Sequence, residues 1–293
     1  QIHCLVLRGQ DNAEFAHNRL WVWLSGIALR DNSHDSLLDS NTMPTAMTRL
    51  RAFTLHLTGS VLIFLIFLGL MFFIWYPAPY FTIEVGWAAL SILIGAGLAL
   101  GPLLTLIVFK PGKRGLKFDM VCIVLMQLGA FLYGGFLIYQ ERPAFVVFGV
   151  DRFTAIPTSA IDVDQVPAEL RQGSQPWLAQ ADFPEDPKVR EHLMFAVLSG
   201  APDIEYHPEL YRPYAPDLLD LRKRSIDLPT LTARDADAKI AIDHFLARKS
   251  GRLADYLYLP LKGKKKDIVM VLSAHDGKPA GYIAISPWRE DYR

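Results

Sequence analysis

The chain has 293 residues, of which 51% are hydrophobic, and its 30 basic and 30 acidic side chains give no net charge. A neutral chain without a long run of one charge argues against a nucleic-acid-binding protein held by phosphate contacts. The two cysteines, Cys4 and Cys122, offer no disulfide framework. The mean hydropathy of +0.20 is high for a soluble protein, and the apolar excess falls between Phe53 and Tyr139.

Residues 1–46 lack the pattern of a folded element. Their apolar stretch, residues 20–29, is too short to span a membrane, and polar turn-forming residues follow it. Three interpretations are open: an upstream translation artefact with the true start at Met43 or Met47, a cytoplasmic tail, or a cleaved signal peptide. A signal peptide fits poorly, because no small-residue cleavage site follows an uninterrupted apolar core. We expect a non-native or disordered extension.

Three apolar segments follow, at residues 53–76, 85–109 and 120–139. At 1.5 Å per residue, about 24 helical residues reach roughly 36 Å, which is enough to cross the hydrocarbon layer of a membrane with some tilt. Trp75 and Tyr76 close the first segment, as interfacial aromatic residues do. The region 47–140 is therefore predicted to be an anchor of three transmembrane helices.

The positive charges around these segments predict their orientation. The link at residues 77–84 has no Lys or Arg, whereas the start of the first segment and the link after the second are basic. Because positive residues stay on the cytoplasmic side, we expect the N-terminus inside and everything after Gln140 outside. For a bacterial inner membrane, outside is the periplasm. The topology-determining residues are Arg49, Arg51, Lys110, Lys113, Arg114 and Lys117.

Several residues inside the apolar segments are small or polar. Gly97 and Gly101 have the spacing that lets helix backbones approach closely, and Pro102 should kink the second helix near its centre. Gln127 and Thr105 are polar groups at depth that need hydrogen-bond partners, which other helices of the chain can supply. Two interpretations are open for the glycines: they pack the three helices on each other, or they form a groove that accepts another apolar helix.

Residues 141–293 have ordinary globular composition and a mixed pattern. A strand, a turn near Gly149 and a second strand are expected first, and loops with a short helix between Pro157 and Pro187. Helices follow, one capped by Asp186 with Pro187 at its first position and ended by Gly200. Strands return at the end, with Asp276-Gly277 as a hairpin turn. The pattern predicts an α+β periplasmic domain whose first strands pair with its last. The later helices are expected at residues 217–225 and 233–249, and the last strands at 256–261, 267–273 and 281–286.

Residues 201–216 are dense in proline and tyrosine. One interpretation is an ordered loop whose aromatic side chains cover the edge of the core. The other is a recognition surface, since rigid loops with exposed tyrosines suit partner binding. The candidate partner-binding residues of this outer region are Tyr206, Tyr211, Tyr214 and Trp288.

The sequence contains no catalytic constellation. The histidines after residue 141, which are His192, His207, His244 and His275, have no metal-ligand spacing. Phosphate-binding, dinucleotide-binding and nucleophile-elbow motifs are missing from the sequence. We therefore expect no catalytic residue, no cofactor and no metal, and a binding protein rather than an enzyme.

The order of short motifs along the chain resembles that of the TfpX/TfpZ type IV pilin accessory proteins. The resemblance covers residues 47–293 and rests on the joint order of the motifs rather than on any one of them. It implies an inner-membrane accessory or chaperone-like factor that acts on the pilin, and it implies no active site. The motifs are Arg51-Ala-Phe53, Trp75-Tyr76-Pro77, Leu100 to Thr105, Phe109 to Lys113, Leu116 to Asp119, Gln127, Tyr133-Gly134, Arg142-Pro143, Val150 to Phe153, Pro208 to Tyr211 and Pro287-Trp288.

The expected partners are thus a type IV pilin, the pilus assembly machinery and membrane lipid, with no nucleic acid. The groove around Gly97, Gly101 and Pro102 is expected to meet the pilin's apolar helix, and the Tyr206 to Tyr214 loop or the sheet edge its head. Two other classes stay open: a membrane-anchored periplasmic sensor, for which no cytoplasmic output domain is evident, and a membrane-bound enzyme, for which no carboxylate or histidine cluster is evident.

Overall fold

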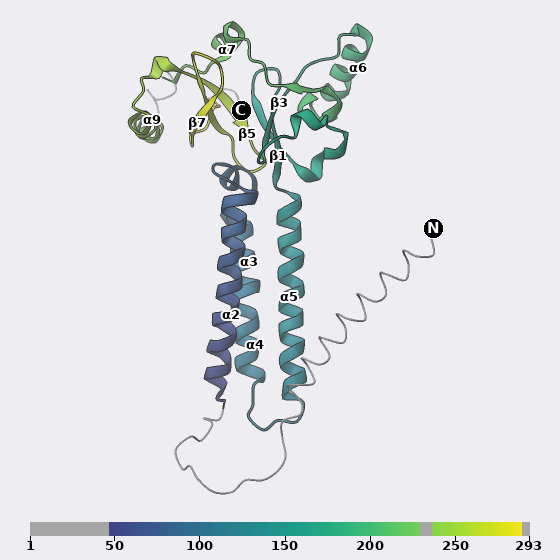
Figure 1. Ribbon diagram of the computed structural model, residues 1–293, viewed down its shortest axis with the longest axis vertical. Helices are drawn as coiled ribbons and strands as arrows, with labels where there is room; N and C mark the ends of the chain where they lie inside the picture. The colour runs from purple at the N-terminus through teal and green to yellow at the C-terminus, as the bar shows by residue number, and fades with distance from the viewer. Residues whose placement is uncertain (1–46, 229–235, 289–293) are drawn as a thin grey trace, which may run out of the picture. The chain divides into compact units, whose positions relative to one another are not determined.

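A computed structural model describes residues 47–228 and 236–288. The expectation for residues 1–46 lies outside these ranges. The described chain consists of long apolar helices followed by a head in which one sheet is flanked by helices (Figure 1).

The first long helix is α2, Arg49–Leu70, which continues through a π-helical segment, Met71–Trp75. Thr48 caps its start, because the Thr48 hydroxyl accepts from the backbone N–H of Arg51 at 3.2 Å. Trp75 ends the helix just before Pro77, as expected. The cause is that a proline biases the residue before it away from helical geometry.

The second apolar segment is helical throughout but changes its hydrogen-bond register. A π-helical turn, Phe81–Val85, leads into α3, Gly86–Ile94, and a second π-helical segment, Gly95–Leu100, leads into α4, Gly101–Val108. Pro102 has no N–H to donate, so the register changes immediately before it. A π-helical segment thus ends just before Pro102, where the sequence predicts a kink.

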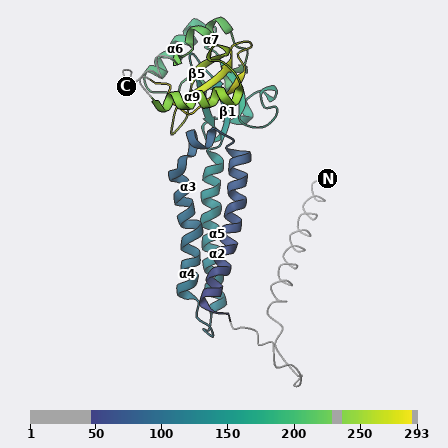
Figure 2. The same ribbon diagram turned by 90° about the vertical axis from the view of Figure 1, so that its left-hand side faces the viewer.

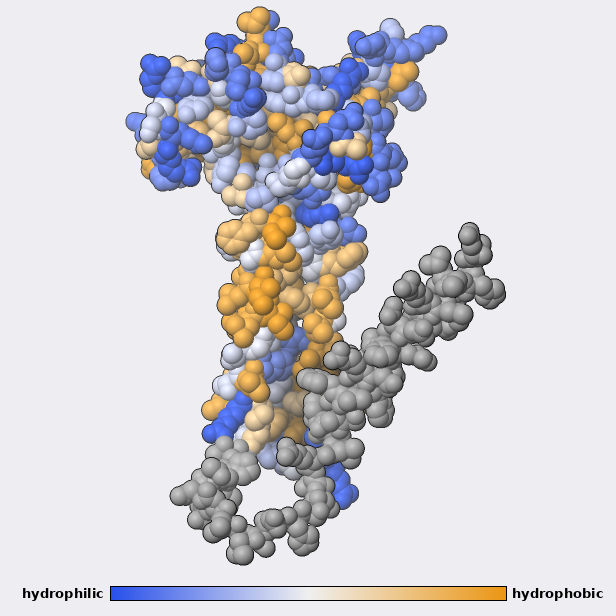
Figure 3. All heavy atoms as spheres, viewed as in Figure 1, coloured by the Kyte–Doolittle hydropathy of each residue, from blue (hydrophilic) through white to orange (hydrophobic). Residues whose placement is uncertain are grey.

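The third long helix is α5, Leu116–Gln140. Within the described residues, three helical stretches are long and apolar enough to cross a membrane: Arg49–Trp75, Leu90–Val108 and Leu116–Gln140. α2 and α5 both pack against α4, and the three run side by side in both views (Figures 1 and 2). Their surface is mostly apolar, whereas hydrophilic residues dominate the surface of the head (Figure 3).

The head is built on a sheet with the strand order β4-β3-β1-β2-β5-β6-β7. β1 pairs parallel with β3 and β2 pairs parallel with β5, whereas the other neighbours are antiparallel. The β2–β5 pairing joins the beginning of the head to its end, which confirms the predicted α+β arrangement. The strands are β1 Pro143–Phe148, β2 Phe153–Pro157, β3 Trp177–Ala181, β4 Tyr211–Pro213, β5 Tyr256–Lys262, β6 Ile268–Ser273 and β7 Pro279–Ile283.

Three helices flank the sheet: α6 Pro187–Leu198, α7 Leu218–Arg224 and α9 Ala236–Lys249. α6 begins and ends as predicted, because Asp186 accepts from the backbone N–H of Lys188 at 2.8 Å and Gly200 has a φ of +98°. The predicted apolar face of α9, Ala238, Ile242 and Phe245, is buried against β6 and β7.

Two short strands were not predicted. Residues 157–187 were expected to hold loops and a short helix, but they contain three 3-10 turns, Thr158–Ala160, Val163–Gln165 and Ala168–Leu170, and then β3. β4 lies inside the stretch expected to be a loop. β3 has five residues without clear alternation and β4 has three, so both draw their stability from non-local pairing that local patterns do not reveal.

Candidate functional site: a polar cluster and an apolar cavity between the long helices

Polar side chains from three helical segments meet inside the long helices. His56 Nδ1 and Thr105 Oγ1 lie 2.6 Å apart and join α2 to α4. Gln127 of α5 donates from Nε2 to the carbonyl oxygen of Gly97 at 2.6 Å and to Ser60 Oγ of α2 at 2.9 Å. The partners expected for Gln127 and Thr105 within the chain are therefore confirmed.

Gly101 makes room for Gln127, and Gly97 lies near Phe131. A Cβ at Gly101 would lie 1.5 Å from Gln127 Oε1, and a Cβ at Gly97 would lie 3.6 Å from Phe131 of α5. Pro102 is buried beside them. The structure thus brings together Gly97, Gly101, Pro102 and Gln127, but it packs the glycine face against α5 of the same chain. The packing interpretation describes Gly101, whereas Gly97 also lines the cavity described next.

An apolar cavity of about 410 Å³ opens beside this cluster. Its lining comes from α2, α4 and α5 and includes both His56 and Gln127. Its outer lining is exposed: Ile63 is 50% exposed, Val124 48% and Leu128 41%. In Figure 3 hydrophilic residues, coloured blue, lie within the otherwise apolar surface of the long helices. The open surface is therefore bordered by α2 and α5, with the glycine face deeper inside.

Sequence reasoning missed His56 and Ser60. They lie four residues apart on α2, which places them on one face of the helix. An ionisable residue followed at this spacing by a hydroxyl, just before an uncharged apolar run, is a signal that could have indicated them.

The candidate residues of the head do not form one surface. Tyr211 is buried, its hydroxyl donates to the carbonyl oxygen of Glu205 at 2.6 Å, and burial raises its pKa well above the usual range. Tyr214 is half-buried and donates to the carbonyl oxygen of Gly277 at 2.9 Å. The expectation of an exposed tyrosine surface fails at Tyr211, because this side chain packs in the core between β1 and the loop.

Tyr206 and Trp288 are also half-buried. Tyr206 packs against the same core cluster as Tyr211, and burial raises its pKa. Trp288 donates from Nε1 to Asp267 Oδ2 at 2.5 Å, and the guanidinium of Arg152 lies 5.9 Å from the centre of its ring. These contacts give both side chains partners within the head.

The topology-determining residues gather at one end of the helices. Arg49 and Arg51 lie in the first turn of α2 and are exposed. The basic turn between α4 and α5 is exposed as well, and Lys113 forms a 2.6 Å ion pair with Asp119. Met47, Phe109 and Met120 border the same cavity, so the start of α2 and the basic turn lie at the same end. The other basic residues of this turn are Lys110, Arg114 and Lys117.

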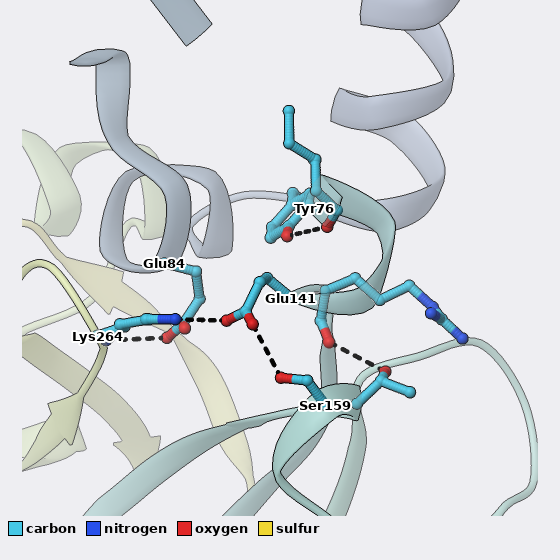
Figure 4. A network of polar contacts seen from close by, with 8 residues as sticks. Tyr76, Glu84, Glu141, Ser159 and Lys264 are labelled. Carbon is cyan, nitrogen blue, oxygen red and sulfur yellow. Dashed lines mark hydrogen bonds and ion pairs between the residues drawn. The ribbon is translucent and has the colours of Figure 1, made fainter. Parts of the chain in front are cut away.

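The opposite end of the helices is fixed to the head by a polar network (Figure 4). Lys264, between β5 and β6, donates from Nζ to Glu141 Oε2 at 2.5 Å and from its backbone N–H to Glu84 Oε1 at 3.3 Å. Ser159 donates to the other oxygen of Glu141 at 3.0 Å, and the hydroxyl of Tyr76 donates to the carbonyl oxygen of Ile138 at 2.6 Å. Tyr76, just before the first link, therefore contacts the end of α5, and Glu84 of the link contacts the turn between β5 and β6.

The pKa values of the two carboxyl groups of this network are shifted in opposite directions. Burial raises the pKa of Glu84 to about 7, although the hydrogen bond and charge of Lys264 act in the other direction. For Glu141, burial is outweighed by the hydrogen bonds from Lys264 and Ser159, which lower its pKa.

Nothing in this network pairs a nucleophile with a base. Within residues 47–228 and 236–288, no group of three or more potential ligands has a geometry that could hold a metal ion.

The chain is similar to fimbrial assembly proteins. The family model of the fimbrial assembly protein FimB matches residues 44–84. The serogroup I fimbrial assembly protein of Dichelobacter nodosus is 30% identical over 228 residues, which cover 74% of this chain and 88% of the relative. The serogroup E1 protein of that organism is 31% identical over 229 residues with the same coverage, and the protein of serogroups C1 and C2 is 37% identical over 116 residues. No solved structure matches the chain.

Proposed function

Because this chain belongs to the family of FimB fimbrial assembly proteins, we propose that it acts in pilus assembly as an accessory protein that contacts the pilin in the membrane. The proposed role is that of a chaperone-like binding protein, without catalysis and without a cofactor. A type IV pilin that awaits assembly has an apolar helix in the lipid and a globular head outside it. A useful partner therefore has both a helical membrane part and an outer domain.

We propose that the three long helices cross the bacterial inner membrane. Their length and composition support this, as does the collection of basic residues at one end. With that end in the cytoplasm, the head lies in the periplasm. The network around Lys264 then sits at the outer surface of the membrane.

The observation that carries the proposal is the cavity beside His56 and Gln127. Ionisable and polar residues within a membrane are costly, and they mark functional positions when they face the inside of a helix bundle. Here they line an apolar cavity of about 410 Å³ whose outer wall is open. We propose that an apolar pilin helix lies along α2 and α5 and covers this opening.

The proposal is tested by filling the cavity. Ile63→Trp places a large ring on the cavity wall, whereas Ile66→Trp makes the same change at a 74% exposed position outside the cavity. Each variant is co-expressed with the pilin of the same bacterium, solubilised in detergent and purified through a tag. We expect Ile63→Trp to reduce the captured pilin about tenfold and Ile66→Trp to leave it unchanged.

A second measurement distinguishes lost pilin binding from a folding defect of the tryptophan variants. A photo-reactive phenylalanine at Leu128, which lines the cavity, is expected to form an adduct with the pilin, whereas one at Met126, a 66% exposed residue on the opposite side of α5, is not. Equal capture by both tryptophan variants, together with no adduct from Leu128, would overturn the proposal.

A further inference from the structure

The two edges of the sheet differ in how they are protected. β4 has only three residues and carries Arg212 and Pro213, and natural proteins use short length, charge and proline to block strand addition. β7, Pro279–Ile283, begins with a proline and has a register irregularity between Pro279 and Gly281, but it carries no charged side chain, and the next two residues are also uncharged. In the ranges that the structure describes, β7 pairs only with β6. Within these ranges the edge from Gly281 onward has no strand partner.

Hollows lie on both faces of this edge. On one face, α9 packs over the sheet (Figure 2). A cavity of about 420 Å³ on this face is lined by Ile240 of α9 and Ile283 of β7, and also by Asp237, His244 and Arg248. On the other face, a cavity of about 570 Å³ lies between Tyr282 and the end of the long helices, where Phe73 and Trp87 line it. Ala284 borders both cavities.

An edge strand with a cavity on each face fits an extended strand of a partner better than a helix. A strand sends successive side chains to opposite faces, so a strand paired with β7 would fill the two cavities with alternate residues. Recognition by strand addition takes its affinity from main-chain hydrogen bonds and its specificity from such alternating pockets. The cavity beside the long helices has no charged residue in its lining and fits apolar side chains. The cavity beside α9 is bordered by Asp237, His244 and Arg248 and fits polar side chains.

We propose that β7 accepts an extended strand from the head of the pilin, with apolar residues on the face toward the long helices, so that the sheet gains an eighth strand. This inference rests on the proposed function, because it takes the pilin as the partner. The larger cavity adjoins the ends of the long helices. A pilin helix that leaves the membrane beside α2 enters the periplasm at this level, which brings its head within reach of β7.

The test is site-specific crosslinking in the full-length protein, co-expressed with the pilin. A photo-reactive phenylalanine replaces Tyr282 in β7 or, as the matched control, Arg212 in β4. We expect an adduct that pilin antibodies detect from position 282 and none from position 212. Amide hydrogen exchange of residues 280–284 is expected to slow when the pilin is present, because strand addition protects backbone N–H groups.

A charge on the edge provides an independent variant. Ala284 is exposed, so Ala284→Lys leaves the core intact and places a cation between the two cavities. We expect this variant to melt at the wild-type temperature and to give about tenfold less adduct from position 282.

Each other outcome of the crosslinking experiment overturns the inference that the pilin adds a strand to β7. An adduct that contains two copies of this chain and no pilin would assign β7 to self-association. No adduct from position 282, with the adduct from Leu128 retained, would refute strand addition and leave the proposed function intact. Loss of both adducts would refute the two proposals together.

Discussion

The backbone N–H of Lys264 donates to Oε1 of Glu84 at 3.3 Å, although 180 residues separate the two in sequence. Glu84 belongs to the link between the first two long helices and is only 4% exposed. The backbone N–H of Lys265 donates to the carbonyl oxygen of Ile83 at 2.7 Å, and Ile83 packs with β5 and β6. The first link of the helices is thus part of the core of the head.

The Glu84 carboxyl makes the stability of this junction depend on pH. Its pKa rises from 4.5 to about 7 on burial, and the charges of Glu141 and Asp267 act in the same direction. The folded state therefore holds the proton more tightly than the unfolded state. The free energy of unfolding is expected to fall as pH rises from about 4.5 to about 7, by on the order of 3 kcal/mol in all.

Glu84→Gln is expected to remove this pH dependence, because the amide oxygen still accepts from Lys264 but never ionises. Melting temperatures in detergent at pH 5, 6, 7 and 8 measure the effect, with the exposed Glu185→Gln as the control. The variant should be more stable than the wild type at pH 8. A wild-type slope in Glu84→Gln would show that another group titrates.

Gly101→Ala tests the packing of α4 on α5. The new Cβ would lie 1.5 Å from Gln127 Oε1, so the helices must shift or Gln127 must give up its bonds to Gly97 and Ser60. We expect a loss of about 1–3 kcal/mol, as for other overpacked cores.

Gly129→Ala in α5 is the matched control, because nothing lies within 4 Å of its Cβ position. Melting temperatures of the two variants give the comparison. Gln127→Ala in the Gly101→Ala background should recover part of the loss, since it removes the obstructing amide. A double variant less stable than Gly101→Ala alone would contradict the steric explanation.

Local sequence patterns were sufficient to predict the elements whose structure depends on their own residues. The three apolar segments, the Asp186 cap with Gly200 after α6, and the Asp276-Gly277 turn all lie where the sequence predicts them. In each case length, a capping side chain or a positive φ at glycine determines the structure within a few residues. Gln127 and Thr105 were correctly predicted to bond within the chain because a polar group in an apolar helix needs a partner.

Elements that depend on distant residues could not be predicted in this way. β3 and β4 are short strands held by β1 and by each other. The contact of Lys264 with Glu84, and the buried position of Tyr211, depend on which segments meet in space. The spacing of His56 and Ser60 was a local signal, but the contact of His56 with Thr105 depends on which helices meet and could not be predicted from it.

Tyr211→Phe distinguishes a core role from a recognition role for the proline- and tyrosine-rich loop. The change leaves the buried carbonyl of Glu205 without its hydrogen bond, which is expected to cost about 1–2 kcal/mol. Tyr133→Phe, at a 66% exposed position of α5, is the control and should melt like the wild type. At a temperature where Tyr211→Phe is folded, pilin capture should be unchanged. Lost capture with an unchanged melting temperature would assign the tyrosine to recognition.

Cysteine labelling tests the proposed orientation. In a background with Cys4→Ser and Cys122→Ser, single cysteines replace Lys113 in the basic turn or Ser174 in the head, both of which are exposed. A maleimide that cannot cross the inner membrane is added to cells with a permeabilised outer membrane. We expect Ser174→Cys to react and Lys113→Cys to react only after the inner membrane is dissolved, because basic links stay in the cytoplasm. The reverse pattern would invert the topology, and it would place β7 and the network around Lys264 on the cytoplasmic side, away from the pilin head.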